Sequence, residues 1–108
     1  MTSITIFQNH DSVSGFHCTG HSGYAKAGKD IVCAAVSVLV INTVNAIETF
    51  TSSPFHLETE EESALIDFRF TKKADHDAEL LIKAMILGLQ GIQNTYGNKN
   101  LILDFKEV

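Results

Sequence analysis

A helical segment that is apolar on nearly every side constrains this chain most. From Ile31 to about Phe50 the sequence reads as one helix, and Asp30 stands where an N-cap residue is expected. Apolar side chains cover most of the helix circumference, which is typical of a buried helix. Three small residues would let it pack closely against a sheet: Ala34, Ala35 and Ser37. Because many of its residues are β-branched, tertiary packing must stabilise this helix.

Segments of two-residue alternation surround the helix and predict a sheet for it to cover. Strands are expected over residues 3–8, 13–19, 55–57, 63–70 and 101–105. A second helix is expected from a cap at Asp75 to Gly97. Its apolar side chains fall on one stripe: Leu81, Met85, Leu89, Ile92 and Tyr96. The order ββαββαβ predicts an α+β fold, a two-layer α/β sandwich whose mixed or antiparallel sheet packs against two helices in one domain, 1–108. The order of the strands in the sheet stays open.

The charge and the length narrow the class of protein. The 108 residues suit one domain, and the net charge of −5 disfavours binding to nucleic acid while it suits a basic partner. No export signal is visible, and the longest apolar run, Ile31 to Ile41, is too short to cross a bilayer. The two cysteines are therefore expected to be reduced thiols in a cytoplasmic protein without a membrane partner.

Cys33 is the first candidate for chemistry. If Asp30 caps the helix, Cys33 occupies its first turn, where backbone N–H groups and the helix dipole favour a thiolate. The alternative is a small buried hydrophobic residue, which a free cysteine often is. Ser37 lies one turn further on the same face and either hydrogen-bonds the site or permits close packing.

His21 lies twelve residues before Cys33, just past the second expected strand. A loop of this length can return the imidazole to the thiol, which gives a Cys–His pair, and Asp30 could orient that imidazole or serve only as the cap. The loop contains glycines that suit either a flap over an extended substrate or an ordinary turn: Gly20, Gly23 and Gly28.

A metal site is the competing interpretation of the same region. His17, Cys18, His21 and Cys33 are all zinc-type ligands. His17 and Cys18 are neighbours on an expected strand, however, and should point to opposite faces. No metal or cofactor is therefore expected. The acidic run 58–62 is interpreted as a solvated turn, with contact to a basic substrate as the lesser option.

One block of sequence is specific: Gly20-His21 followed by Gly28-x-Asp30-Ile31-Val32-Cys33-Ala34-Ala35-x-Ser37, with Val44-Asn45-Ala46-Ile47 on the same helix. Through this block, and over the whole chain, the sequence resembles the bacterial ribosomal-processing cysteine protease family. The resemblance implies a homodimeric endopeptidase that removes the N-terminal extension of large-subunit ribosomal protein twenty-seven. It also implies that His21 and Cys33 are catalytic, that Asp30 and Ser37 support them, and that residues 22–29 form a mobile loop.

The mechanism expected from this likeness is attack by the Cys33 thiolate, with His21 protonating the leaving amine. Backbone N–H groups at the front of the helix, including that of Cys33, are expected to hold the oxyanion. An apolar pocket is expected beside the loop, because the family cleaves after an aromatic-rich segment. The rival hypothesis is a non-catalytic ribosome-assembly or peptide-binding protein that uses the same groove.

Overall fold

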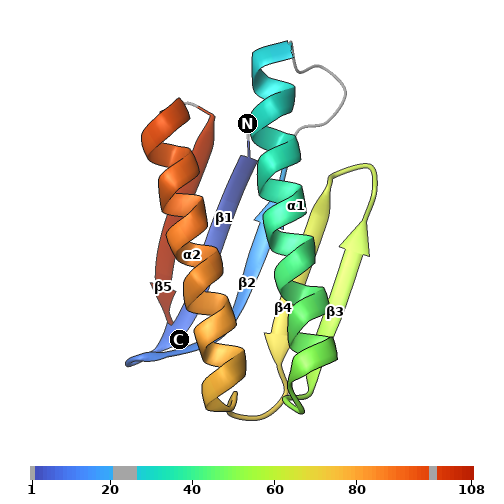
Figure 1. Cartoon of the computed structure of the whole chain (residues 1–108), viewed down its shortest axis with the longest axis vertical. Coiled ribbons are helices and arrows are strands. Elements are labelled where there is room, and N and C mark those ends of the chain that lie inside the picture. The colour runs from blue at the N-terminus through green and yellow to red at the C-terminus, as the bar shows by residue number, and fades with distance from the viewer. Residues whose placement is uncertain (1, 21–26, 98–99) are drawn as a thin grey trace.

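Five strands form one sheet, and two helices cover one of its faces (Figure 1). The computed structural model describes residues 2–20, 27–97 and 100–108, with residues 27–30 as helical backbone. The elements in chain order are β1 (Thr2–Asn9), β2 (Ser12–Thr19), α1 (Ala27–Phe50), β3 (Phe55–Glu60), β4 (Leu65–Phe70), α2 (His76–Tyr96) and β5 (Leu101–Glu107). The predicted fold class and element order are confirmed.

The sheet has the strand order β3-β4-β2-β1-β5. Three pairings are antiparallel, whereas β1 and β5 run parallel, so the sheet is mixed. The central strands β1 and β2 are joined by a turn at residues 10–11. β1 starts, and β2 ends, at the end of the sheet where α1 begins (Figure 1). This connection places the start of β1, the end of β2 and the first turns of α1 together.

The core lies between the sheet and the helices. On α1 the side chains that face the sheet recur every four residues as Val32, Val36, Val40 and Val44, and Ile47 follows. The small residues expected against the sheet are placed differently, since Ala34 and Ser37 are exposed. Close packing occurs instead between the helices, where Gly88 of α2 accommodates the Leu39 side chain.

The limits of α2 are as predicted. The Asp75 side chain accepts a hydrogen bond of 2.8 Å from the Ala78 N–H, and Gly97 ends the helix with a φ of 86°. The predicted stripe is right in part: Met85 and Leu89 are fully buried, whereas Tyr96 is exposed. Ile82, which the stripe omitted, is buried with them.

Several predicted boundaries are wrong. The strand β4 begins at Leu65 and not at residue 63, because residues 61–64 form the turn between β3 and β4. The helix α1 begins at Ala27, so Asp30 lies inside it and is not its N-cap. Aspartate is accepted in a first turn as well as at a cap, because the positive end of the helix dipole favours it at both places. The strand β3 runs to Glu60, so only the end of the acidic run 58–62 is a turn. Although the end of β3 is rich in charged residues, its pairing with β4 keeps it in the sheet, and charged residues are common on an edge strand.

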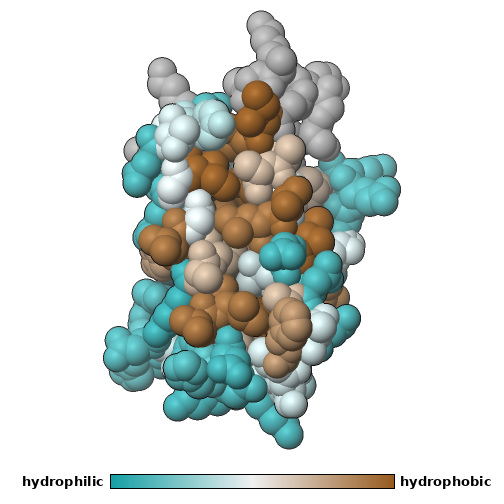
Figure 2. Space-filling view, viewed as in Figure 1, coloured by the Kyte–Doolittle hydropathy of each residue, from teal (hydrophilic) through white to brown (hydrophobic). Residues whose placement is uncertain are grey.

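The outer side of α1 is not buried, contrary to the prediction from its composition. Val38 and Ile41 on α1, together with Leu80 and Leu87 on α2, are exposed. Figure 2 shows the result as a broad apolar area over the two helices. By length and composition alone, the segment Ile31–Phe50 is also long and apolar enough to cross a membrane. The expectation that the apolar run is too short for this is therefore wrong, because the run extends beyond Ile41. A third of that segment is buried in this fold.

Candidate active site

Cys33 is partly buried on α1, on the side that faces the ends of β1 and β2. Its Sγ lies 3.4 Å from the Thr2 Oγ1, in the first residue of β1. Because α1 begins at Ala27, Cys33 is the seventh helical residue and not a first-turn residue. Only the first four N–H groups of a helix are unpaired, and the effect of the dipole fades beyond the first turn. The predicted oxyanion donor, the Cys33 N–H, is therefore inside the helical hydrogen-bond ladder.

A small cavity of about 100 Å³ opens beside the thiol. It is lined by Thr2, Cys18, Gly20, Cys33, Val36, Ser37, Ala64 and Ile66. Three residues singled out from the sequence therefore meet here: Gly20, Cys33 and Ser37. Gly20 directly follows β2, and Cys33 and Ser37 lie on α1. The other lining residues come from β1, β2, α1 and the β3–β4 hairpin.

An apolar groove continues from this cavity between α1 and the β3–β4 hairpin. The groove has a volume of about 410 Å³ and shares Ser37, Ala64 and Ile66 with the smaller cavity. Ile41, Val44 and the edge-strand residue Leu57 line it, and Glu60 and Glu61 lie at the hairpin end. The structure thus places an apolar groove beside the cavity that contains Cys33, with three lining residues in common.

Cys18 is the second thiol of the site. It is buried on β2 and lines the same cavity as Cys33. Burial, and to a lesser degree the nearby Cys33, raises the pKa of the Cys18 thiol to about 11. A thiol that stays protonated is a poor nucleophile. The sequence pattern had assigned Cys18 only to the zinc alternative, although its alternation with Phe16 indicates the inward face.

His17 points to the other face of the sheet, as the alternation predicted. Its Nδ1 lies 2.7 Å from the Asp67 Oδ2, and Arg69 donates from Nε to the other carboxylate oxygen at 3.1 Å. Burial alone would raise the pKa of Asp67, but the hydrogen bonds from His17 and Arg69 lower it overall. Arg69 also lies over the Phe7 ring at 4.0 Å. His17 and Cys18 therefore cannot ligate one ion, and no group of three or more metal ligands occurs among the residues that the structure describes.

The remaining predicted site residues lie at the start of α1 or before it. Gly28 belongs to α1, so the predicted loop 22–29 is wrong at its end, where the helix has already begun. Asp30 is likewise a residue of the helix. His21 and Gly23 lie outside the described residues.

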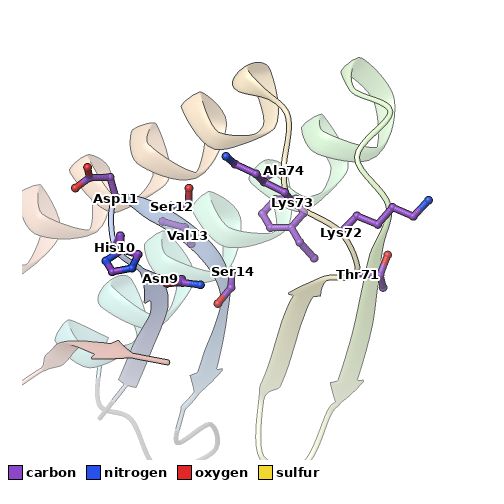
Figure 3. A pocket seen from close by; sticks show the side chains of 11 residues that line it. Asn9, His10, Asp11, Ser12, Val13, Ser14, Thr71, Lys72, Lys73 and Ala74 are labelled. Atoms are coloured by element: carbon purple, nitrogen blue, oxygen red, sulfur yellow. The ribbon is translucent and has the colours of Figure 1, made fainter.

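A hollow larger than the groove lies elsewhere on the described part of the chain. It has about 670 Å³ and lies at the opposite end of the sheet, between the β1–β2 turn and the segment that joins β4 to α2. Figure 3 shows its lining, which includes His10, Lys72 and Lys73. No thiol lines it, so its size does not make it the candidate for cysteine chemistry.

The raised pKa of Cys18 has a consequence for stability. An unfolded cysteine has a pKa of about 8.5, so between roughly pH 9 and 11 the unfolded chain loses this proton while the native chain keeps it. The native state then binds more protons, and the free energy of unfolding falls as the pH rises. Over this pH range we expect the free energy of unfolding of the wild type to fall by about 2–3 kcal/mol more than that of Cys18→Ala. Urea unfolding under reducing conditions measures both free energies. If they change in parallel with pH in the wild type and in Cys18→Ala, the prediction is contradicted.

Known proteins resemble this chain over nearly its full length. Residues 1–100 match the family described as Cysteine protease Prp. The Ribosomal processing cysteine protease Prp of Bacillus subtilis (strain 168) is 34% identical over 101 residues, which cover 89% of this chain and 90% of that protein. The crystal structure of the ribosomal processing protease Prp from S. aureus with a substrate peptide is 28% identical, with a TM-score of 0.90 over 98% of this chain and 100% of that one. A crystal structure of the S. aureus protease with a covalently linked product peptide is 29% identical, with a TM-score of 0.87 over the same shares.

Proposed function

Because the chain belongs to the cysteine protease Prp family, we propose that it removes the N-terminal extension from large-subunit ribosomal protein twenty-seven. One observation carries the proposal: Cys33 lies in a cavity that opens into an apolar groove. The similar B. subtilis protein is named for ribosomal processing, and the S. aureus protease has been crystallised with substrate and product peptides. The net charge of −5 suits a basic ribosomal protein and disfavours direct binding of nucleic acid.

Cys33 is the nucleophile and His21 its acid–base partner in this proposal. The Sγ attacks the carbonyl carbon of the scissile peptide bond, and the imidazolium of His21 gives its proton to the leaving amine. Water then attacks the thioester while the neutral His21 takes up a proton, which releases the carboxylate product and the free thiol. Gly20 lines the cavity and His21 is the next residue in the chain, which supports this pairing.

Ser37 takes a supporting role at the junction of the two hollows. Ser37 is exposed and lines both the cavity at Cys33 and the apolar groove, which supports a contact between its hydroxyl and a bound peptide backbone. Asp30 loses the capping role and remains a candidate to orient His21. Residues 22–26 stay the proposed substrate loop; Gly20 precedes this loop and Gly23 belongs to it.

The apolar groove is proposed to bind apolar side chains of the substrate. Leu57 is 41% exposed at its wall, so Leu57→Asp places a charge there without opening the core. We expect kcat/KM for the extended ribosomal protein to fall roughly tenfold, mainly through KM, since losing one apolar contact costs about 1–3 kcal/mol.

The matched control for this variant is Phe105→Asp. Phe105 is 46% exposed on β5, at the opposite edge of the sheet and away from the groove. It should leave kcat/KM unchanged. Equal losses in the two variants would contradict a binding role for the groove.

We also propose that the chain is a cytoplasmic homodimer joined through the apolar helical face, defined as Val38, Leu80 and Leu87. A contiguous exposed apolar area of this kind marks an interaction surface, and it lies over both helices in Figure 2. A second copy presents an equally apolar face, as a two-fold interface requires.

The homodimer predicts the effect of charge on this face. Val38→Glu together with Leu87→Glu should raise the dimer dissociation constant by roughly 100-fold or more, because unpaired carboxylates would be buried at the interface. Light scattering across a concentration series measures the change. A double variant that stays dimeric, or a wild type that is monomeric and binds lipid vesicles instead, would refute this interface.

The test of the proposed function is incubation of the purified chain with the ribosomal protein carrying its N-terminal extension. Mass spectrometry should show one cut that leaves the mature protein, and a substrate without the extension should stay intact. The rival hypothesis of a non-catalytic peptide-binding protein predicts binding of the extended protein with no change in its mass.

A further inference from the structure

Thr2 brings a buried hydroxyl to the sulfur of the proposed nucleophile. The residue is only 3% exposed, and its Oγ1 lies 3.4 Å from the Cys33 Sγ, although the two residues are 31 positions apart in the sequence. A buried hydroxyl needs a hydrogen-bond partner, and this contact supplies one. It is a direct contact between β1 and the thiol on α1.

The backbone holds Thr2 in place from both sides. Its N–H donates to the Asn100 carbonyl at 3.2 Å, and Thr2 pairs with Leu101 in the parallel register of β1 and β5. On the other side of β1, Ser3 pairs with Thr19 of β2. A β-branched side chain has few χ1 choices, so a fixed backbone also fixes the direction of the hydroxyl.

Gly20 lies beside this contact. A Cβ at Gly20 would lie 3.5 Å from the Thr2 Oγ1, an ordinary van der Waals distance, so the hydroxyl is next to the residue that follows β2 as well as to the thiol. Among the described residues that line the cavity, the titratable groups are the two thiols, Cys18 on β2 and Cys33 on α1. The threonine hydroxyl adds a neutral polar group to this pair.

We propose that Thr2 is a positioning residue for the Cys33 thiolate. A thiolate carries no proton, so in the reactive state the threonine O–H must be the donor and the sulfur the acceptor. A hydrogen bond to a charged acceptor is stronger than one between neutral groups. The contact therefore favours the thiolate over the thiol and holds Sγ facing the cavity. This inference rests on the proposed role of Cys33 as nucleophile.

The experiment compares Thr2→Val with Thr2→Ser, both in a Cys18→Ala background that leaves one thiol. Valine keeps the shape of threonine without the hydroxyl, and serine keeps the hydroxyl. The rate of alkylation by iodoacetamide is measured from pH 5 to 10. We expect Thr2→Val to shift the midpoint of the pH dependence of this alkylation rate upward by about half to one pH unit. Its kcat for peptide cleavage should fall roughly three- to tenfold with KM unchanged, and Thr2→Ser should restore both values.

Each outcome has one meaning. A purely structural role would lower the melting temperature of Thr2→Val and leave the alkylation midpoint in place, which would overturn the proposal. If Thr2→Val does not fold, Thr2→Ala and Thr2→Ser replace the comparison, because both lack the methyl group and only serine has the hydroxyl. Failure of the proposed function is seen separately, as cleavage that persists in Cys33→Ala.

Discussion

Replacement of Cys33 by alanine should abolish cleavage of the extended ribosomal protein. We expect kcat to fall by roughly 10³-fold or more, since removal of a nucleophile leaves only binding and electrostatic contributions. The chain should still fold, because Cys33 is only partly buried at the edge of a cavity. Binding of the substrate peptide should persist, which isothermal titration calorimetry measures beside the kinetic assay.

Cys18→Ala is the matched control for this substitution. Both thiols line the same cavity, but Cys18 is buried and stays protonated at neutral pH. Its loss should leave kcat within a few-fold of the wild type, while lost packing lowers stability slightly. Equal losses of activity in the two variants would show that the cavity, and not one thiol, is what cleavage requires.

Replacement of Phe68 by alanine should cause the largest loss of stability. Phe68 on β4 is 0% exposed and contacts three other aromatic rings, Phe16, Phe55 and Phe70, at centroid distances of 4.7–5.1 Å. Truncating a buried phenylalanine costs about 3–5 kcal/mol. That is a large share of the 5–15 kcal/mol typical of a domain, so the variant should be largely unfolded near 40 °C.

The position of Phe68 in the fold also matters for the candidate active site. Phe68 is two residues from Ile66 on the same face of β4, and Ile66 lines both the cavity and the groove. Phe50→Ala provides the control, because Phe50 at the end of α1 is 75% exposed. Thermal unfolding followed by circular dichroism should show a change of less than about 1 kcal/mol for it. A small effect of Phe68→Ala would mean that the aromatic cluster does not stabilise the hairpin.

Local patterns were sufficient to predict most of the elements. The alternation of Ile4 and Ile6, and of Ile66 and Phe68, predicted strands, because a strand with one buried face must alternate. The Asp75 cap and the Gly97 terminus predicted the limits of α2, because both act through hydrogen bonds within a few residues. The start of α1 was missed because aspartate is compatible with either side of a helix boundary. The end of β3 was missed because its partner strand, and not its own composition, extends it.

The sequence by itself determined the element order, the family and the presence of a cysteine on the long helix, because these depend on spacing along the chain. Only the tertiary structure decided that Thr2 and Cys18 share a cavity with Cys33, and that an apolar groove runs from it to Leu57. The tertiary structure also decided which side of α1 packs against the sheet and which side is exposed. That side depends on how a nearly uniform apolar helix is rotated against the sheet, and such a helix carries no polar stripe to specify its rotation.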